Sequence, residues 1–144
     1  MVSSKRVTFI CGLPGSGKTH YLNAHMKDFE GALILDDPSV TLVGTLQALL
    51  PIFDQIVIVD PILCMKTRRE IAERIFEGWK KTWIFFENDF KACWDNVQFR
   101  NDKRLVSQLC ISTLSAMYDT PEGVSTLPIY RAKEETKSSS DSEY

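Results

Sequence analysis

The sequence has 144 residues, 44% of them hydrophobic, and a formal net charge of −2. This length suits one compact domain and is short for two, and the apolar content suffices for a buried core. A near-neutral charge argues against a protein that binds nucleic acid through charge alone and leaves open a local basic groove.

Cysteine spacing and the chain ends give two further expectations. The four cysteines are far apart, without a CxxC pair, which predicts reduced thiols. The sequence shows no signal peptide and no long apolar run, so we expect a cytoplasmic protein that does not span a membrane. Residues 132–144 are polar and acidic, and we predict that they form a disordered tail after one domain at residues 1–131.

Strand and helix patterns alternate along the chain. Runs of β-branched and aromatic residues indicate buried strands, and apolar residues at helical spacing indicate helices. In chain order the predicted elements are a strand at 7–11, a helix at 17–28, a strand at 32–35, a helix at 40–50, a strand at 56–60, a helix at 65–79, a strand at 82–86, a helix from 88 or 89 to 100, a helix at 103–118 and a strand at 126–130. This order predicts an α/β fold in which helices cover both faces of a parallel sheet.

The segment Gly12-Leu13-Pro14-Gly15-Ser16-Gly17-Lys18-Thr19 matches the phosphate-binding pattern GxxxxGK[ST]. It follows a predicted buried strand and precedes a predicted helix, as this pattern requires. Its glycines allow the backbone to turn N–H groups inward around an anion, and the helix N-terminus adds positive potential. We therefore expect all eight residues to bind ATP, with Lys18 at the β- and γ-phosphates and the Thr19 hydroxyl on Mg²⁺.

Three aspartates follow predicted strands, at the sheet edge where ligands of parallel sheets bind. Asp60 comes after four aliphatic residues and fits the Walker B position, which holds Mg²⁺. Asp36 stands where a kinase needs a general base for the acceptor hydroxyl. The competing interpretation is that Asp60 caps a turn and that Asp36 and Asp37 only turn the chain, with Asp37 as the better cap. We expect Asp37 and Asp60 to lie on the acceptor side.

Two groups of cations are candidates for offsetting phosphate charge. Arg68 and Arg69 open the helix after the third predicted strand, near the ligand edge, and are expected to bind the acceptor. Arg100, Lys103 and Arg104 lie between two predicted helices, a spacing that suits a small lid over the triphosphate. The alternative for this second group is a solvated face whose cations pair with nearby aspartates.

Taken together, several segments resemble the P-loop kinase domain of bacteriophage polynucleotide 5′-kinases and of small predicted kinases of phages and bacteria. They are Ile10–Thr19, Leu35-Asp36-Asp37, Ile58-Val59-Asp60 with Arg68-Arg69, and Asn96–Arg104. The resemblance covers about residues 5–131 and implies a five-stranded parallel sheet in the order 2-3-1-4-5. It also implies that ATP and Mg²⁺ are used, that Asp36 is the general base, and that Arg104, or less favourably Arg100, is the lid arginine.

One position departs from the family pattern. Ser39 stands where polynucleotide kinases carry an arginine that contacts the phosphate of the acceptor strand. The acceptors that stay open are a polynucleotide 5′-hydroxyl, a nucleoside, a modified base with a hydroxymethyl group, and a smaller metabolite. A nucleotide-binding regulator without phosphoryl transfer is a further alternative. A GTPase is disfavoured, because Leu63 occupies the position of its glycine and no Asn-Lys-x-Asp motif is present.

Overall fold

The computed structural model describes residues 4–36, 47–100 and 108–131. Its centre is a five-stranded sheet in the order β2-β3-β1-β4-β5 with every neighbouring pair parallel. The strands are β1 (Arg6–Cys11), β2 (Leu33–Asp36), β3 (Gln55–Val59), β4 (Lys80–Phe86) and β5 (Thr126–Leu127). The predicted fold class and strand order are confirmed. The tail at 132–144 lies outside the described residues, so the domain limits stay a prediction.

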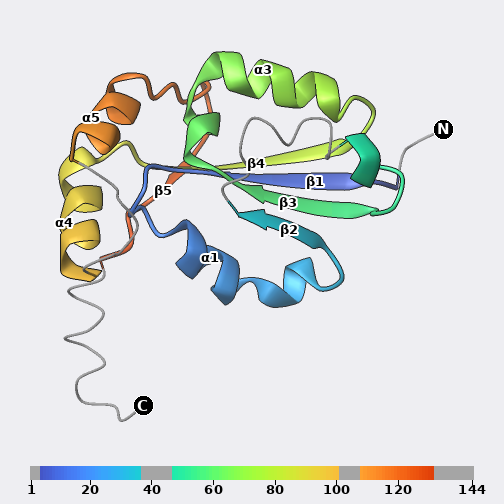
Figure 1. Ribbon diagram of the computed structural model, residues 1–144, viewed down its shortest axis with the longest axis horizontal. Coiled ribbons are helices and arrows are strands. Elements are labelled where there is room, and N and C mark those ends of the chain that lie inside the picture. The colour runs from blue at the N-terminus through green and yellow to red at the C-terminus, as the bar shows by residue number, and fades with distance from the viewer. Residues whose placement is uncertain (1–3, 37–46, 101–107, 132–144) are drawn as a thin grey trace, which may run out of the picture.

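Helices cover both faces of the sheet, with α1 on one face and α3 on the other (Figure 1). The α-helices are α1 (Lys18–Ala24), α3 (Lys66–Ile75), α4 (Phe90–Arg100) and α5 (Gln108–Ala116), and 3₁₀ helices span η1 (Met26–Phe29) and η3 (Pro61–Cys64). Of the helix predicted at 40–50, the described residues 47–49 are helical. No helix in the described parts of the chain is long and apolar enough to cross a membrane.

Adjacent residues of each strand supply two separate cores, because successive side chains of a strand point to opposite faces. On the α1 face, Ile10, Val57 and Phe86 pack with residues from α1, α4 and α5. On the α3 face, Phe9 and Phe85 pack with residues from η3 and α3. Each fully buried side chain of this size stabilises the fold by about 1.5–3 kcal/mol. Near-continuous apolar strands therefore fix a sheet that is covered on both sides.

Several predicted element limits were wrong, and local geometry explains them. The first helix changes to a 3₁₀ turn because the N–H of His25 is shared between the carbonyls of Tyr21 and Leu22. The helix α3 ends before Gly78, which turns the chain with a φ of 85°. The last strand stops at Pro128, which has no N–H for the ladder. Within α3, the apolar side chain of Ile71 is 39% exposed.

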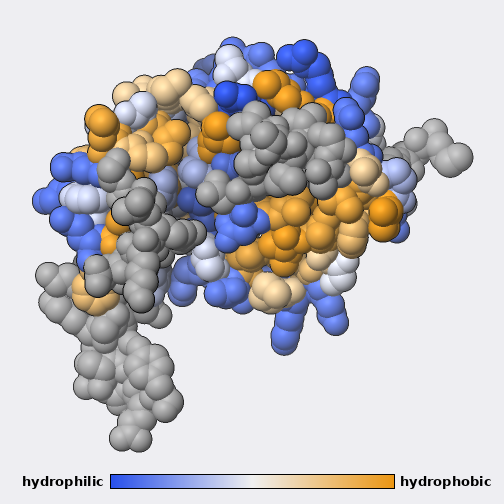
Figure 2. Space-filling model, in the orientation of Figure 1, coloured by the Kyte–Doolittle hydropathy of each residue, from blue (hydrophilic) through white to orange (hydrophobic). Residues whose placement is uncertain are grey.

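The carboxyl ends of three neighbouring strands form the edge that carries the site. In the register of the sheet, Val59 of β3 lies opposite Ile10 of β1 on one side and Asp36 of β2 on the other. The residues that follow β1 and β3, Gly12 and Asp60, therefore lie at the same edge as Asp36. Figure 2 shows apolar side chains gathered over β2, the end strand of the sheet next to β3.

Candidate active site

The loop between β1 and α1 adopts a conformation that depends on glycine. Gly15 and Gly17 have φ values of 86° and 108°, which side-chain-bearing residues rarely adopt. The N–H of Ser16 donates to the carbonyl of Leu13 at 3.0 Å, which closes the turn. Successive backbone N–H groups in such turns form a concave site for an anion.

Close packing around this loop leaves no room for side chains at its glycines. A Cβ on Gly12 would lie 2.4 Å from the Ser16 Oγ, and one on Gly15 would lie 2.4 Å from the Cys93 carbonyl oxygen. A Cβ on Gly17 would lie 2.5 Å from the Cβ of Tyr130. The loop is therefore backed by α4 and by the segment after β5.

Lys18 folds back over the loop and lies near two of the predicted aspartates. Its Nζ donates to the carbonyls of Gly12 at 2.8 Å and Leu13 at 2.9 Å. Burial lowers the pKa of Lys18 below its ordinary value, and the electrostatic influence of Cys64 and Cys93, followed by that of Asp36 and Asp60, opposes this shift. The strand register and the bond from the Asp60 N–H to the Ile10 carbonyl at 3.2 Å place both carboxylates at the sheet edge from which this loop begins.

Ser16 provides a test of whether this loop fits a phosphate. Its side chain is fully buried, and within the described residues its Oγ has no hydrogen-bond partner. A buried hydroxyl without a partner costs about 1–3 kcal/mol. A phosphate oxygen in the loop would accept a hydrogen bond from it, so the donors present fit the group that the motif predicts.

The two predicted Mg²⁺ ligands lie in different surroundings. Asp60 is 5% exposed, and its Oδ1 accepts a hydrogen bond from the N–H of Ile62 at 2.9 Å. The capping role that we considered for Asp60 is therefore present, beside its proximity to Lys18. Thr19 lies in the first turn of α1 and is exposed. Carboxylate and hydroxyl oxygens suit Mg²⁺, so this donor set is chemically compatible with the ion.

The remaining predicted residues are only partly described. Asp36 ends β2 and is exposed, and its role as a base stays a prediction. Asp37 and Arg104 lie outside the described residues, and so does the side chain of Arg100, the last residue of α4. The lid therefore stays a prediction.

Arg69 is engaged in the fold of the α3 face. It is 7% exposed, and it donates to the carbonyl of Leu63 at 3.0 Å and to Asp119 Oδ2 at 2.5 Å. Its guanidinium also lies 5.3 Å from the centre of the Phe85 ring. These contacts tie α3 to the segment after α5. Arg68, by contrast, is half-buried.

Two residues that contact the phosphate loop are not among the residues predicted from the sequence. The amide Nδ2 of Asn96 in α4 donates to the carbonyl of Gly15 at 2.8 Å and to the carbonyl of Tyr130. The N–H of Tyr130 in turn donates to the carbonyl of Ser16 at 3.0 Å. A signal was present, because Asn96 comes three residues after Cys93 and four after Ala92, both buried, and a polar residue on the buried face of a helix calls for a hydrogen-bond partner.

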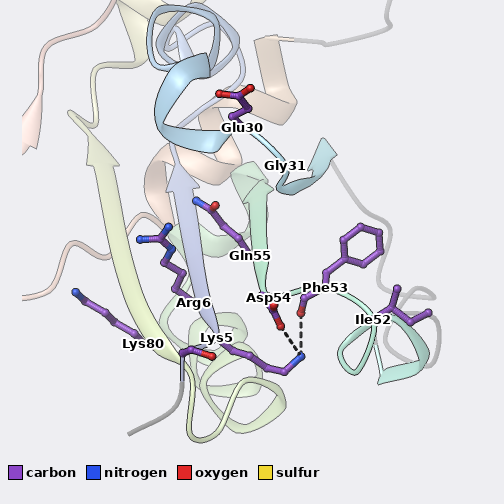
Figure 3. A pocket seen from close by; sticks show the side chains of 10 residues that line it. Lys5, Arg6, Glu30, Gly31, Ile52, Phe53, Asp54, Gln55 and Lys80 are labelled. Atoms are coloured by element: carbon purple, nitrogen blue, oxygen red, sulfur yellow. Dashed lines mark hydrogen bonds and ion pairs between the residues drawn. The ribbon is translucent and has the colours of Figure 1, made fainter.

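Two surface hollows that the described residues form lie away from the loop. One of about 490 Å³ is at the opposite edge of the sheet, where Lys5, Arg6 and Lys80 project near the amino ends of the strands (Figure 3). The Lys5 Nζ is held there by the Phe53 carbonyl at 3.0 Å and by Asp54 at 3.5 Å. The other, of about 660 Å³, lies between α3 and residues 119–124.

Comparison with known proteins places the chain in a family. No family model matches the sequence. The chain is 33% identical over 120 residues to the uncharacterized protein R277 of Acanthamoeba polyphaga mimivirus, and the match covers 80% of this chain and 87% of that protein. The chain belongs to the family of that protein.

Solved structures share the fold at low sequence identity. A chain of the Pnkp1/Rnl/Hen1 RNA repair complex matches with a TM-score of 0.66 and 14% identity, over 89% of this chain and 49% of that one. The present chain thus spans about half of that neighbour. A gluconokinase from Sinorhizobium meliloti 1021 matches with a TM-score of 0.59 and 14% identity, over 92% and 86% of the two chains. The structure of APE1195 matches with a TM-score of 0.55 and 19% identity, over 95% and 93%. The fold is that of P-loop kinases.

Proposed function

We propose that this protein is an ATP-dependent kinase that transfers the γ-phosphoryl group to a hydroxyl. One observation carries the proposal: the glycine-rich loop with Lys18, which follows β1, lies at the same sheet edge as Asp36 and Asp60. A loop of this kind binds the donor, and carboxylates at the neighbouring strand ends face the side from which an acceptor would approach. The kinase fold of the structural neighbours supports the same conclusion.

Each residue at this edge has a separate chemical task. The loop N–H groups and the Ser16 hydroxyl bind phosphate oxygens, and Lys18 exchanges the carbonyls of its own loop for the β- and γ-phosphates. Thr19 and Asp60 would hold Mg²⁺, which when bound offsets charge on the phosphate oxygens.

Asp36 is proposed to act on the acceptor. It accepts the hydroxyl proton as the bond from the acceptor oxygen to phosphorus forms and the bond from phosphorus to the β-phosphate oxygen breaks. Arg104, or Arg100, is proposed to offset the charge that develops on the γ-phosphoryl group. Asp37, Arg68 and Arg69 are proposed to face the acceptor, with Arg69 available only if its contact with Asp119 opens.

For the acceptor we propose a polynucleotide 5′-hydroxyl, or a hydroxyl of a nucleoside or modified base. The support is the resemblance of the motif set to polynucleotide kinases and the structural likeness to a chain of an RNA repair complex. A small polyhydroxylated metabolite is the second candidate, because a gluconokinase shares the fold over 86% of its own length.

The test is transfer of label from γ-labelled ATP with Mg²⁺. Separate reactions contain 5′-hydroxyl DNA, 5′-hydroxyl RNA, nucleosides, hydroxymethylated DNA and sugar acids. We expect label in one of the first four, and its loss in Asp36→Asn with ATP binding retained. Label in the sugar acids alone would favour the metabolite kinase. Bound ATP without label in any reaction would favour the non-transferring regulator.

A further inference from the structure

The outer side of the phosphate loop is fastened to two other parts of the chain through carbonyl groups. Asn96 Nδ2 bonds to the Gly15 carbonyl at 2.8 Å, and the N–H of Tyr130 bonds to the Ser16 carbonyl at 3.0 Å. Asn96 Nδ2 also bonds to the Tyr130 carbonyl, so the two fastenings are joined. Asn96 is 4% exposed, and an amide in this setting donates one hydrogen to each carbonyl.

These bonds orient the N–H groups that would face a phosphate. The carbonyl and the N–H of one trans peptide point in opposite directions. The bond from the Tyr130 N–H points the Ser16 carbonyl toward the segment after β5. The N–H of Gly17, which belongs to the same peptide, therefore points away from that segment. The bond from Asn96 fixes the preceding peptide, whose N–H, that of Ser16, closes the turn on the Leu13 carbonyl, and it does so at Gly15, which has a φ of 86°.

We propose that Asn96 is a positioning residue that holds the phosphate loop in its anion-binding conformation. It acts through Gly15 and through the Tyr130 segment and does not contact the phosphates itself. This inference rests on the proposed function, since it assigns Asn96 to the same site.

The competing explanation is that Asn96 only satisfies buried carbonyls and stabilises the folded state. The two explanations differ in one respect. A purely structural residue changes the unfolding temperature and leaves the affinity of the folded protein for phosphate unchanged. A positioning residue changes the affinity of the folded protein for any ligand that the loop binds, whether or not it carries a nucleoside.

The experiment compares Asn96→Ala and Asn96→Asp with the wild type. The aspartate has the size of asparagine and places an oxygen where two carbonyls need a donor. Gln98→Ala is the matched control, because Gln98 is exposed on the same helix. Asn96→Ser, which keeps one donor, is measured in parallel in case the other variants do not fold. Circular dichroism and thermal unfolding establish folding, and calorimetric titration with ATP and with inorganic triphosphate gives the dissociation constants.

We expect the dissociation constants for both ligands to rise by about tenfold in Asn96→Ala and further in Asn96→Asp, with Gln98→Ala unchanged. Asn96→Ser is expected to lie between the wild type and Asn96→Ala. Wild-type affinities in every folded Asn96 variant would overturn the inference, even if their unfolding temperatures fell. If the wild type itself bound neither ligand, the proposed function would fail before the role of Asn96 came into question.

Discussion

Replacing Gly15 with alanine tests how closely the phosphate loop packs on α4. Gly78 is a matched control, because its φ of 85° is nearly that of Gly15, at 86°. A Cβ on Gly78 would meet nothing within 4 Å, whereas one on Gly15 would lie 2.4 Å from the Cys93 carbonyl oxygen and 2.9 Å from Val97 Cγ2. The two substitutions therefore share a backbone cost and differ in steric overlap.

The expected costs follow from these contacts. An alanine in the left-handed region loses about 1–2 kcal/mol, and the reduced freedom of its unfolded chain returns about 0.4–1 kcal/mol. We therefore expect Gly78→Ala to lower the free energy of unfolding by roughly 1 kcal/mol. Gly15→Ala adds an overlap with a helix carbonyl that cannot move freely, for a total of about 2–4 kcal/mol.

Urea unfolding of both variants measures the difference, and titration with ATP shows its consequence. Gly15→Ala is expected to bind ATP at least tenfold more weakly where it is still folded, because relief of the overlap moves the loop. Gly78→Ala is expected to bind ATP as the wild type does. Equal unfolding costs for the two variants would refute the reasoning that α4 supports the loop.

Three further predictions concern single contacts. Asp36→Asn is expected to leave ATP affinity nearly intact and to slow transfer by about 10²-fold or more in single-turnover assays, and unchanged transfer would remove Asp36 from the mechanism. Asp119→Ala is expected to lower the free energy of unfolding by about 1–2 kcal/mol, since it leaves the buried Arg69 without its carboxylate partner. Adding Arg69→Met to Asp119→Ala should recover part of this loss. If the double variant instead lost the sum of what the two single variants lose, the reasoning would be contradicted. Burial raises the pKa of the Cys64 and Cys93 thiols to about 12. As the pH rises, the thiols of the unfolded chain ionise before those of the folded protein. The free energy of unfolding is therefore unaffected by these thiols below about pH 9 and falls from there toward pH 12, by up to about 1.4 kcal/mol per pH unit for each thiol. In urea unfolding measured between pH 9 and pH 12, the free energy of unfolding of Cys93→Ala should fall less steeply with pH than that of the wild type. An equal slope for the two proteins would count against the burial effect.

Much of the fold could be predicted because its signals are local. Apolar runs such as Ile56–Val59 indicate strands that are buried on both faces, and the alternation with helices requires parallel strands. The phosphate loop is likewise a contiguous motif whose context is readable from its flanks. The strand order came from the resemblance to a family, since no local pattern encodes which strands are neighbours.

The missed parts of the site depend on contacts between distant residues. Asn96 lies 81 positions from Gly15 and 34 from Tyr130, so no helical or strand period relates them. The ion pair of Arg69 joins residues 50 positions apart, and the sequence alone suggested a role at the ligand edge for this arginine. The predicted ends of the first helix and the last strand were wrong for a different reason. The N–H shared at His25 and the ring of Pro128 each act within a single turn, which is shorter than the patterns that indicate a helix or a strand.

The central claim is that Lys18 and Asp36 serve one phosphoryl-transfer reaction at the edge formed by β1, β2 and β3. The most direct measurement is transfer of label from γ-labelled ATP to hydroxyl acceptors by the wild type, Lys18→Met and Asp36→Asn, with ATP affinity determined for each. The account predicts transfer by the wild type, weak ATP binding with no transfer in Lys18→Met, and near-normal binding with strongly reduced transfer in Asp36→Asn. Binding of ATP by the wild type without transfer to any acceptor would contradict it.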